Sequence, residues 1–238
     1  MRMRWYGQAA VLLTSAEGVR VFLDPWGEIP EEMLALRRER MPDFRFDYAP
    51  IEGVDADVLL VTHEHFDHAA VEVIGGEPHV VRSTAGTFET PIGEIVGIAS
   101  EHDEVAGTQR GPNTIFAFTL DGLRVAHFGD FGQAELRPAQ RDALGDIDVV
   151  FLPVGGGPTV GGESAAAVVR ELGPRLVVAL HYGNDAVSFL GPPEPFLEAL
   201  GAPRVERLET SEAEAEPLLG EAGSPTVVLF APPMRSMT

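Results

Sequence analysis

Short apolar runs separated by turn residues follow one another along the chain, and they predict a protein built largely from β-strands. Residues 8–14 and 19–23 lie on either side of a Glu-Gly turn, as the two arms of a hairpin do. Residues 56–61 are almost continuously apolar, which is typical of a strand covered on both faces. Asp121-Gly122 fits a type I′ turn between two β runs, because both residues accept positive φ angles. Strands are also expected over residues 79–83, 88–90, 94–99, 114–120, 123–128, 147–152, 176–180 and 227–230.

Helical patterns are short and lie between these strands. They are expected over residues 30–40, 69–74, 163–172 and 195–200. Two successive strand-rich halves, each ending in a helix, are consistent with two sheets flanked by helices. The first helix lies in a charged, turn-rich segment and carries Arg37, Arg38 and Arg40. We interpret it as a solvated helix, because a run of charges is usually an exposed face, and the alternative of a lid over residues 30–45 stays open.

Composition excludes several kinds of site. The 238 residues include no cysteine, which leaves His, Asp and Glu as the strong metal ligands. With 17 basic against 37 acidic residues, the net charge is −20, and this argues against binding to a nucleic acid polymer or an anionic membrane. The chain shows neither a long apolar span nor the apolar core of a signal peptide, so we expect a cytoplasmic protein with no membrane partner.

One cluster of metal-ligand residues dominates the sequence. Residues 62–68 read Thr-His-Glu-His-Phe-Asp-His and follow the strand expected over residues 56–61. His63 and His65 point the same way from an extended segment, so they can hold one ion together. Asp67 and His68 can turn towards a second ion. The zinc motif His-Glu-x-x-His is excluded, because Asp67 stands where its second histidine would be.

Further ligands must come from elsewhere in the chain. Three candidates directly follow expected strands, where sites lie in layered α/β folds: His102, Asp130 and His181. Gly129 and Gly132 flank the carboxylate and let the backbone approach a site closely. His79 begins a strand and His127 lies inside one, so we interpret both as structural histidines.

With these motifs the chain resembles the metallo-β-lactamase fold superfamily. The resemblance covers roughly residues 4–184 and rests on the His-x-His-x-Asp-His signature, followed in order by His102, Phe128-Gly-Asp130 and His181. Phrases at residues 110–113, 121–124, 127–130, 152–155 and 181–183 look like the branch of ascorbate-6-phosphate lactonase-like and other metal-dependent hydrolases. The implied fold class is α/β, a four-layer αββα sandwich, which residues 1–238 are expected to form as a single domain.

The resemblance also implies a centre with two divalent ions. It assigns the first ion to His63, His65 and His102, and the second to Asp67, His68 and His181, with Asp130 bridging them. Two ions about 3.5–4 Å apart can share a water and lower its pKa. Asp67 would accept a hydrogen bond from the resulting hydroxide and aim it. Zinc suits these ligands best, and manganese and iron stay open.

These assignments predict an enzyme that uses the bridging hydroxide to cleave a small-molecule ester or lactone, including a phosphorylated one. Two alternatives stay open: a small-molecule phosphodiesterase on the same site, and a metal-binding protein without turnover.

Di-iron oxygen-reducing relatives carry a glutamate where this chain has His65, which disfavours redox chemistry. Asn113 (a candidate catalytic residue), Tyr182 and Arg110 are candidate oxyanion or substrate donors, although Asn113 fits a turn-fixing role equally well. The Gly-rich run 155–158 lacks the Lys-Ser/Thr of a phosphate-binding loop, so we interpret it as a flexible turn. Assembly as a homo-oligomer also stays open.

Overall fold

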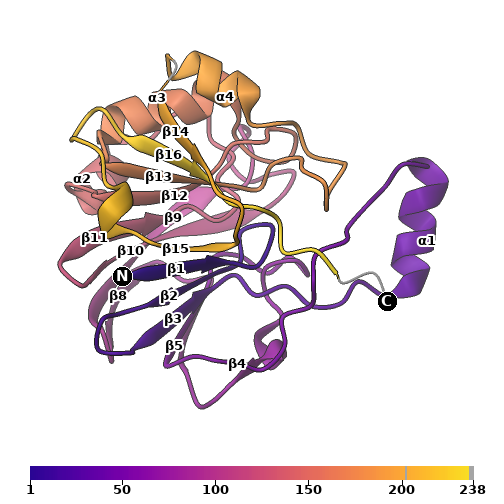
Figure 1. Cartoon of the computed structure of the whole chain (residues 1–238), viewed down its shortest axis with the longest axis horizontal. Helices are drawn as coiled ribbons and strands as arrows, with labels where there is room; N and C mark the ends of the chain where they lie inside the picture. The colour runs from indigo at the N-terminus through magenta and orange to yellow at the C-terminus, as the bar shows by residue number, and fades with distance from the viewer. Residues whose placement is uncertain (202, 236–238) are drawn as a thin grey trace.

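Two β-sheets that share one hydrophobic core form the body of the protein (Figure 1). The computed structural model describes residues 1–201 and 203–235. The first sheet consists of β1 (Arg2–Trp5), β2 (Val11–Thr14), β3 (Arg20–Leu23), β5 (Val58–Val61), β7 (His79–Arg82) and β15 (Glu212–Glu214). Its strand order is β15-β1-β2-β3-β5-β7. A separate two-stranded pair joins β4 (Val54–Asp55) to β6 (Ile74–Gly75).

The second sheet is larger and carries most of the strands expected from the sequence. It consists of β8 (Gly86–Thr90), β9 (Gly93–Glu101), β10 (Pro112–Leu120), β11 (Leu123–His127), β12 (Val149–Pro153), β13 (Leu176–Leu180), β14 (Arg204–Arg207) and β16 (Thr226–Leu229). The order is β14-β16-β13-β12-β11-β10-β9-β8. All residues of β5, β12 and β13 are buried, and for β5 this confirms the strand predicted over residues 56–61 to be covered on both faces.

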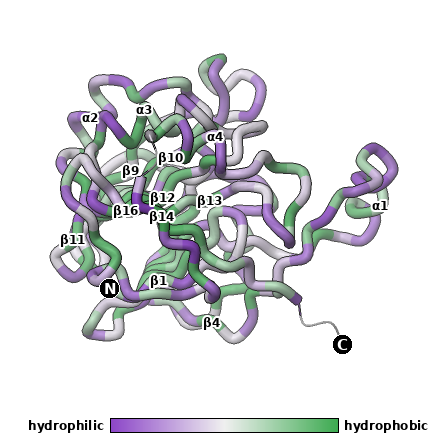
Figure 2. Tube along the Cα trace, turned by 45° about the horizontal axis from the view of Figure 1, so that its top comes forward, coloured by the Kyte–Doolittle hydropathy of each residue, from purple (hydrophilic) through white to green (hydrophobic). Residues whose placement is uncertain are grey.

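Three helices lie on the side of the eight-stranded sheet, and one stands away from the body (Figure 1). α3 (Gly162–Leu172) turns one apolar face to the core and packs against α4 (Glu194–Ala199), and α2 (Pro138–Leu144) contacts β9. α1 (Glu31–Arg40) projects as an arm and buries none of its residues. Figure 2 shows the apolar residues gathered in the central strands. This is the α/β sandwich that the sequence predicts.

Several local predictions are confirmed, and others are wrong for identifiable reasons. Asp121 and Gly122 have φ angles of 52° and 76°, as a type I′ turn between β10 and β11 requires. Residues 69–74 do not form a helix: Val71–Val73 makes a single 3₁₀ turn before β6, because β-branched side chains favour strands. The sequence does not predict β1, β14, β15 or α2, because each is too short for its period to stand out, although Arg2–Trp5 does alternate between exposed and buried residues.

The direction of the strands determines where loops can meet. β11, β12 and β13 are mutually parallel, and β9 runs with them because β10 is antiparallel to both of its neighbours. The carboxyl ends of β9, β11 and β13 therefore lie at one edge of the sheet. β5 is parallel to β3 and β7 in the other sheet, and its carboxyl end leads into residues 62–68.

In the part of the chain that the structure describes, no helix is long and apolar enough to cross a membrane.

Candidate metal centre

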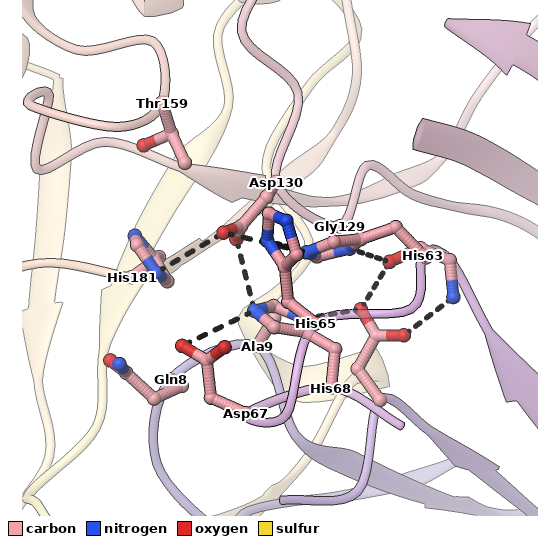
Figure 3. A network of polar contacts seen from close by, with 12 residues as sticks. Gln8, Ala9, His63, His65, Asp67, His68, Gly129, Asp130, Thr159 and His181 are labelled. Carbon is pink, nitrogen blue, oxygen red and sulfur yellow. Dashed lines mark hydrogen bonds and ion pairs between the residues drawn. The ribbon is translucent and has the colours of Figure 1, made fainter. Parts of the chain in front are cut away.

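Seven side chains from four strand ends converge on one point. They are His63, His65, Asp67 and His68 after β5, His102 after β9, Asp130 after β11 and His181 after β13. Figure 3 shows those of His63, His65, Asp67, His68, Asp130 and His181. We call these seven residues the metal cluster. The structure thus brings together every ligand candidate singled out from the sequence, while His79 lies exposed on β7, outside the cluster.

The loop after β5 supplies four of the seven side chains because it first extends and then turns. His63 Nε2 lies 3.1 Å from His65 Nδ1, so these two imidazoles meet on one side as their spacing predicts. The backbone N–H of His68 donates to the carbonyl of His65 at 3.0 Å and closes a turn. This turn brings Asp67 and His68 to the neighbouring position, where His181 joins them.

Asp130 lies at the centre of the metal cluster and connects its two halves. One half is His63, His65 and His102, and the other is Asp67, His68 and His181; within each, ligand atoms lie within 4.8 Å of one another. Asp130 Oδ2 is 3.1 Å from His102 Nε2 and 3.4 Å from His181 Nε2. Its other oxygen, Oδ1, is 3.3 Å from His68 Nε2. A carboxylate that reaches both halves is in the position of a bridging ligand.

Unpaired polar atoms test whether these residues fit a metal ion. Within the described residues, His68 Nε2 and Asp130 Oδ1 are buried and have no polar partner other than each other, at 3.3 Å. Leaving a buried polar atom unpaired costs about 1–3 kcal/mol. A divalent cation satisfies such atoms directly, and imidazole nitrogens with carboxylate oxygens are suitable donors for zinc, manganese and iron. The donor set therefore fits a divalent metal.

Burial and neighbouring charges prepare the ligands for binding. Burial lowers the pKa values of His63, His65 and His181, so these imidazoles stay neutral and keep a free lone pair. Burial acts to raise the pKa of Asp130, but the adjacent His181 and His68 hold that pKa well below its usual value. Burial acts to lower the pKa of His68, but the charges of Asp130 and Asp67 outweigh it and raise that pKa. A bound cation would supply the positive charge that these carboxylates otherwise draw from a proton on His68.

Asp24 contacts the metal cluster, and sequence reasoning missed it. It follows β3 with a φ of 50°, and its carboxylate accepts the N–H and the hydroxyl of Thr62, both at 2.7 Å. Its Oδ2 also accepts from His68 Nδ1 at 3.1 Å, which leaves Nε2 of that ring facing Asp130. Carboxylates commonly orient metal-binding histidines in this way. The available signal was an aspartate at the carboxyl end of a strand, the same signal that identified Asp130.

Two glycines let the backbone close around the metal cluster, as expected from their positions beside Asp130. A Cβ on Gly132 would lie 2.4 Å from the carbonyl carbon of His102, and one on Gly129 would lie 2.3 Å from Thr62 Oγ1. Gly129 also has a φ of 54°, which disfavours other residues. His127 supports the same turn: its Nδ1 accepts from the N–H of Gly129, and its Nε2 donates to the carbonyl of Ala9. His127 is thus the structural histidine that the sequence predicts.

Two of the expected substrate contacts have other roles. The Asn113 amide donates to Ser100 Oγ and to the carbonyl of Phe128, and its Oδ1 accepts from the N–H of Asp130 at 3.2 Å. Asn113 is buried and positions the Asp130 turn, which is the turn-fixing role that the sequence left open for it. Tyr182 is also buried, donates to the carbonyl of Phe230 and stacks on Trp5, so it does not face the cluster.

A cavity of about 400 Å³ opens above the metal cluster, and Arg110, the third expected contact, lines it. The segment around α1 supplies the far wall with Arg37, Met41 and Phe44. α1 is therefore an exposed helix, as its charges indicate, yet one of its faces borders the site. The Gly-rich run after β12 forms a turn with positive φ at Gly156 and Gly157.

Known proteins share both the sequence pattern and the fold. The family model of the beta-lactamase superfamily domain matches residues 2–181. The chain belongs to this superfamily. A UPF0173 metal-dependent hydrolase from Methanoregula boonei is 29% identical over 213 residues, which cover 77% of this chain and 83% of that protein. A UPF0173 protein from Pyrococcus furiosus is 25% identical over 221 residues, covering 86% and 93%.

Solved structures support the same assignment. A Thermotoga maritima protein, described as a candidate zinc-dependent hydrolase of the metallo-beta-lactamase superfamily, superimposes with a TM-score of 0.71 at 26% identity. The match covers 97% of this chain and 99% of that one. Membership in the beta-lactamase superfamily confirms the family and the sandwich fold expected from the His-x-His-x-Asp-His signature. The number of ions and the ligand role of each residue stay predictions.

Proposed function

We propose that this beta-lactamase superfamily protein, a metal-dependent hydrolase, cleaves a small-molecule ester or lactone at a centre of two divalent ions. The observation that carries the proposal is the position of Asp130, which reaches both halves of the metal cluster. In that assignment His63, His65 and His102 hold one ion, and Asp67, His68 and His181 hold the other. Zinc is the ion we propose first, because imidazoles and carboxylates suit it well.

The chain's own residues would do the positioning. Bound divalent ions supply a nucleophile from water at neutral pH and polarise the attacked carbonyl. Asp67 is less buried than its neighbour His68 and lines the cavity, where its carboxylate can accept a hydrogen from the attacking water and orient it. Asp24 holds His68 from behind, and Asn113 holds the backbone of Asp130. These supports keep the ligands in place without contacting the substrate.

A phosphate diester is the second candidate substrate on the same site, and Arg110 in the cavity wall favours it. The small cavity and the net charge of −20 support a small molecule as the substrate rather than a nucleic acid polymer. A third candidate role, binding metal without turnover, differs from both in that no substrate is hydrolysed.

The test combines metal analysis with a substrate panel. Purified protein is analysed for bound metal, and two ions per chain are expected, while a ratio well below one contradicts the centre. Lactones, carboxylic esters, thioesters and bis-p-nitrophenyl phosphate are then assayed with zinc or manganese. Asp67→Ala should abolish hydrolysis, and the matched variant His79→Ala, outside the cluster, should leave it unchanged. Unaltered hydrolysis in Asp67→Ala contradicts the mechanism, and no hydrolysis by the natural protein favours a binding role.

A further inference from the structure

Two cavities adjoin beside α1. The first is the cavity above the metal cluster, and the second, of about 480 Å³, lies along α1 between Met33, Leu36 and Phe189. Arg37, Met41, Phe44 and Phe189 line both, so one passes into the other. We call the second cavity the α1 groove. A molecule that reacts at the metal cluster can therefore extend into this groove.

Two arginines line the cavity above the cluster without a carboxylate partner. Nine of the 17 arginines pair with acids, as Arg82 does with Glu64 and Arg38 with Glu31. Among residues 1–201 and 203–235, no carboxylate lies at ion-pair distance from Arg37 or Arg110. The guanidinium carbon of Arg37 instead lies 5.7 Å from the ring centre of Phe44 and 5.9 Å from that of Phe66. Both guanidinium groups are available to an anion in the cavity.

The loop that carries Arg110 is held in one conformation. The carboxylate of Asp103, next to His102, accepts backbone N–H groups from Val105, Gly107, Gln109 and Arg110 at 2.8–3.0 Å. The N–H of His102 donates to the carbonyl of Gly111 and joins the two ends of the loop. The backbone of Arg110 thus has a defined place beside the metal cluster, which reduces the entropy lost when its side chain binds an anion.

Exposed apolar side chains border the two cavities, and Arg37 and Arg40 also line the α1 groove. Leu36, Met41 and Phe66 are 59%, 44% and 41% exposed, and they are three of the six large apolar side chains that are exposed in the described part of the chain. Each of the three borders at least one of the two cavities. Exposed apolar groups gathered at one place mark a binding surface more often than scattered ones do. The groove is continuous with the cavity above the metal cluster.

We propose that the substrate is an amphiphilic anion, whose carboxylate or phosphate group lies between Arg37 and Arg110 and whose apolar chain lies in the α1 groove. The proposal rests on the proposed function, since it places the scissile ester above the metal cluster. Guanidinium groups bind carboxylate and phosphate with charge-assisted hydrogen bonds. Each methylene buried in the groove adds affinity, so chain length and charge contribute separately.

The test measures binding of three probes to the metal-loaded protein by isothermal titration calorimetry. Octyl phosphate carries both features, inorganic phosphate lacks the chain, and 1-octanol lacks the charge. We expect octyl phosphate to bind at least about tenfold more tightly than either of the others. Equal affinities of octyl phosphate and inorganic phosphate would remove the groove from the proposal, and equal affinities of octyl phosphate and octanol would remove the anion site.

Variants then locate the two contacts. The double variant Arg37→Gln/Arg110→Gln should weaken octyl phosphate binding at least about tenfold, and Met41→Ser should reduce its advantage over inorganic phosphate. The matched control is Arg38→Gln, because Arg38 lies on the same helix, pairs with Glu31 and lines neither cavity. Affinity in the control should change less than about twofold. Wild-type affinity in the double variant overturns the proposal.

A second copy of the chain is the competing occupant of the α1 groove, and sedimentation detects it. If the protein is a dimer that Leu36→Glu converts to a monomer, the second copy fills the groove and the proposal is wrong.

Binding and turnover are also measured independently. Arginine-dependent binding of octyl phosphate without hydrolysis of any ester supports the groove and contradicts the proposed function. Hydrolysis that is unaffected in the arginine double variant supports the function and contradicts the anion site.

Discussion

Oδ2 of Asp24 lies 3.1 Å from Nδ1 of His68, and both side chains are completely buried. The two residues follow different strands of the same sheet and lie 44 positions apart in the chain. Because a carboxylate can only accept, Nδ1 of His68 carries the hydrogen and Nε2 faces Asp130. This contact therefore sets which nitrogen of His68 is presented to a metal.

Asp24→Asn should weaken metal binding by about 10–100-fold, because an amide orients His68 less strongly than a carboxylate does. Competition with a chromogenic chelator measures the affinity, and thermal melting checks the fold. Asp57→Asn is the matched control, since Asp57 directly precedes β5 but pairs with Arg20 at the surface. Equal metal affinity in both variants would show that Asp24 does not support the centre.

Gly132→Ala should displace His102 and weaken the half of the metal cluster that contains it. The new Cβ would lie 2.4 Å from the carbonyl carbon of His102, and backbone at that distance must move. A loss of about 1–3 kcal/mol in the free energy of unfolding is expected from such overpacking. Metal content and denaturant unfolding report the two effects. Gly27→Ala, whose nearest contact would be the methyl group of Ala70 at 3.1 Å, should be milder, and equal effects would show that the close contact is not the cause.

Removal of bound metal should lower the melting temperature. Ligands that bind only the folded chain stabilise it by about 2.7 kcal/mol at a hundredfold excess over Kd, and for a chain of this length that is worth roughly 5–10 °C. A chelator should produce this shift in the natural protein and in His79→Ala, whose substituted residue lies outside the cluster. In His181→Ala the shift should be smaller. A melting temperature that does not respond to chelator or zinc contradicts the metal centre.

Asp103→Ala should loosen the loop that carries Arg110. Burial acts to raise the pKa of Asp103, but four backbone N–H groups outweigh it and lower that pKa, so the loop is organised around a charged carboxylate. Hydrogen exchange should become faster at Val105, Gly107 and Arg110 once these groups lose their acceptor. Glu104→Ala, an exposed neighbour, is the control. Unchanged exchange in Asp103→Ala would show that other contacts hold the loop.

Local spacing explains why so much of the metal cluster could be predicted. His63, His65, Asp67 and His68 are within six positions, so their grouping depends only on the extended backbone and the turn at residues 65–68. His102, Asp130 and His181 were found through a second local signal, their place directly after apolar runs. Strands that run in the same direction end at the same edge of a sheet, so these three residues are expected at one site although they are far apart in the sequence.

Other roles depend on hydrogen-bond partners that are distant in the sequence, and no local pattern predicts them. Asn113 and Tyr182 are polar residues near the site in the chain, and sequence alone could not show that Ser100, Phe128 and Phe230 already satisfy them. Asp24 follows a strand as Asp130 does, but only the pairing of β3 with β5 brings it to Thr62 and His68. The border of α1 with the cavity above the metal cluster also depends on the path of the segment that follows it.

The sequence by itself determined the chemistry of this protein: without cysteine, and with three histidines and an aspartate after a buried strand, the chain predicts a His/Asp metal centre. Only the tertiary structure decided which polar groups remain free for ions and substrate and which are used within the protein. The physical reason is that a buried polar atom must find a partner, and most of those partners lie far away along the chain. Asp24 holds His68, Asn113 holds Asp130, and Arg37 and Arg110 are left to face the cavity.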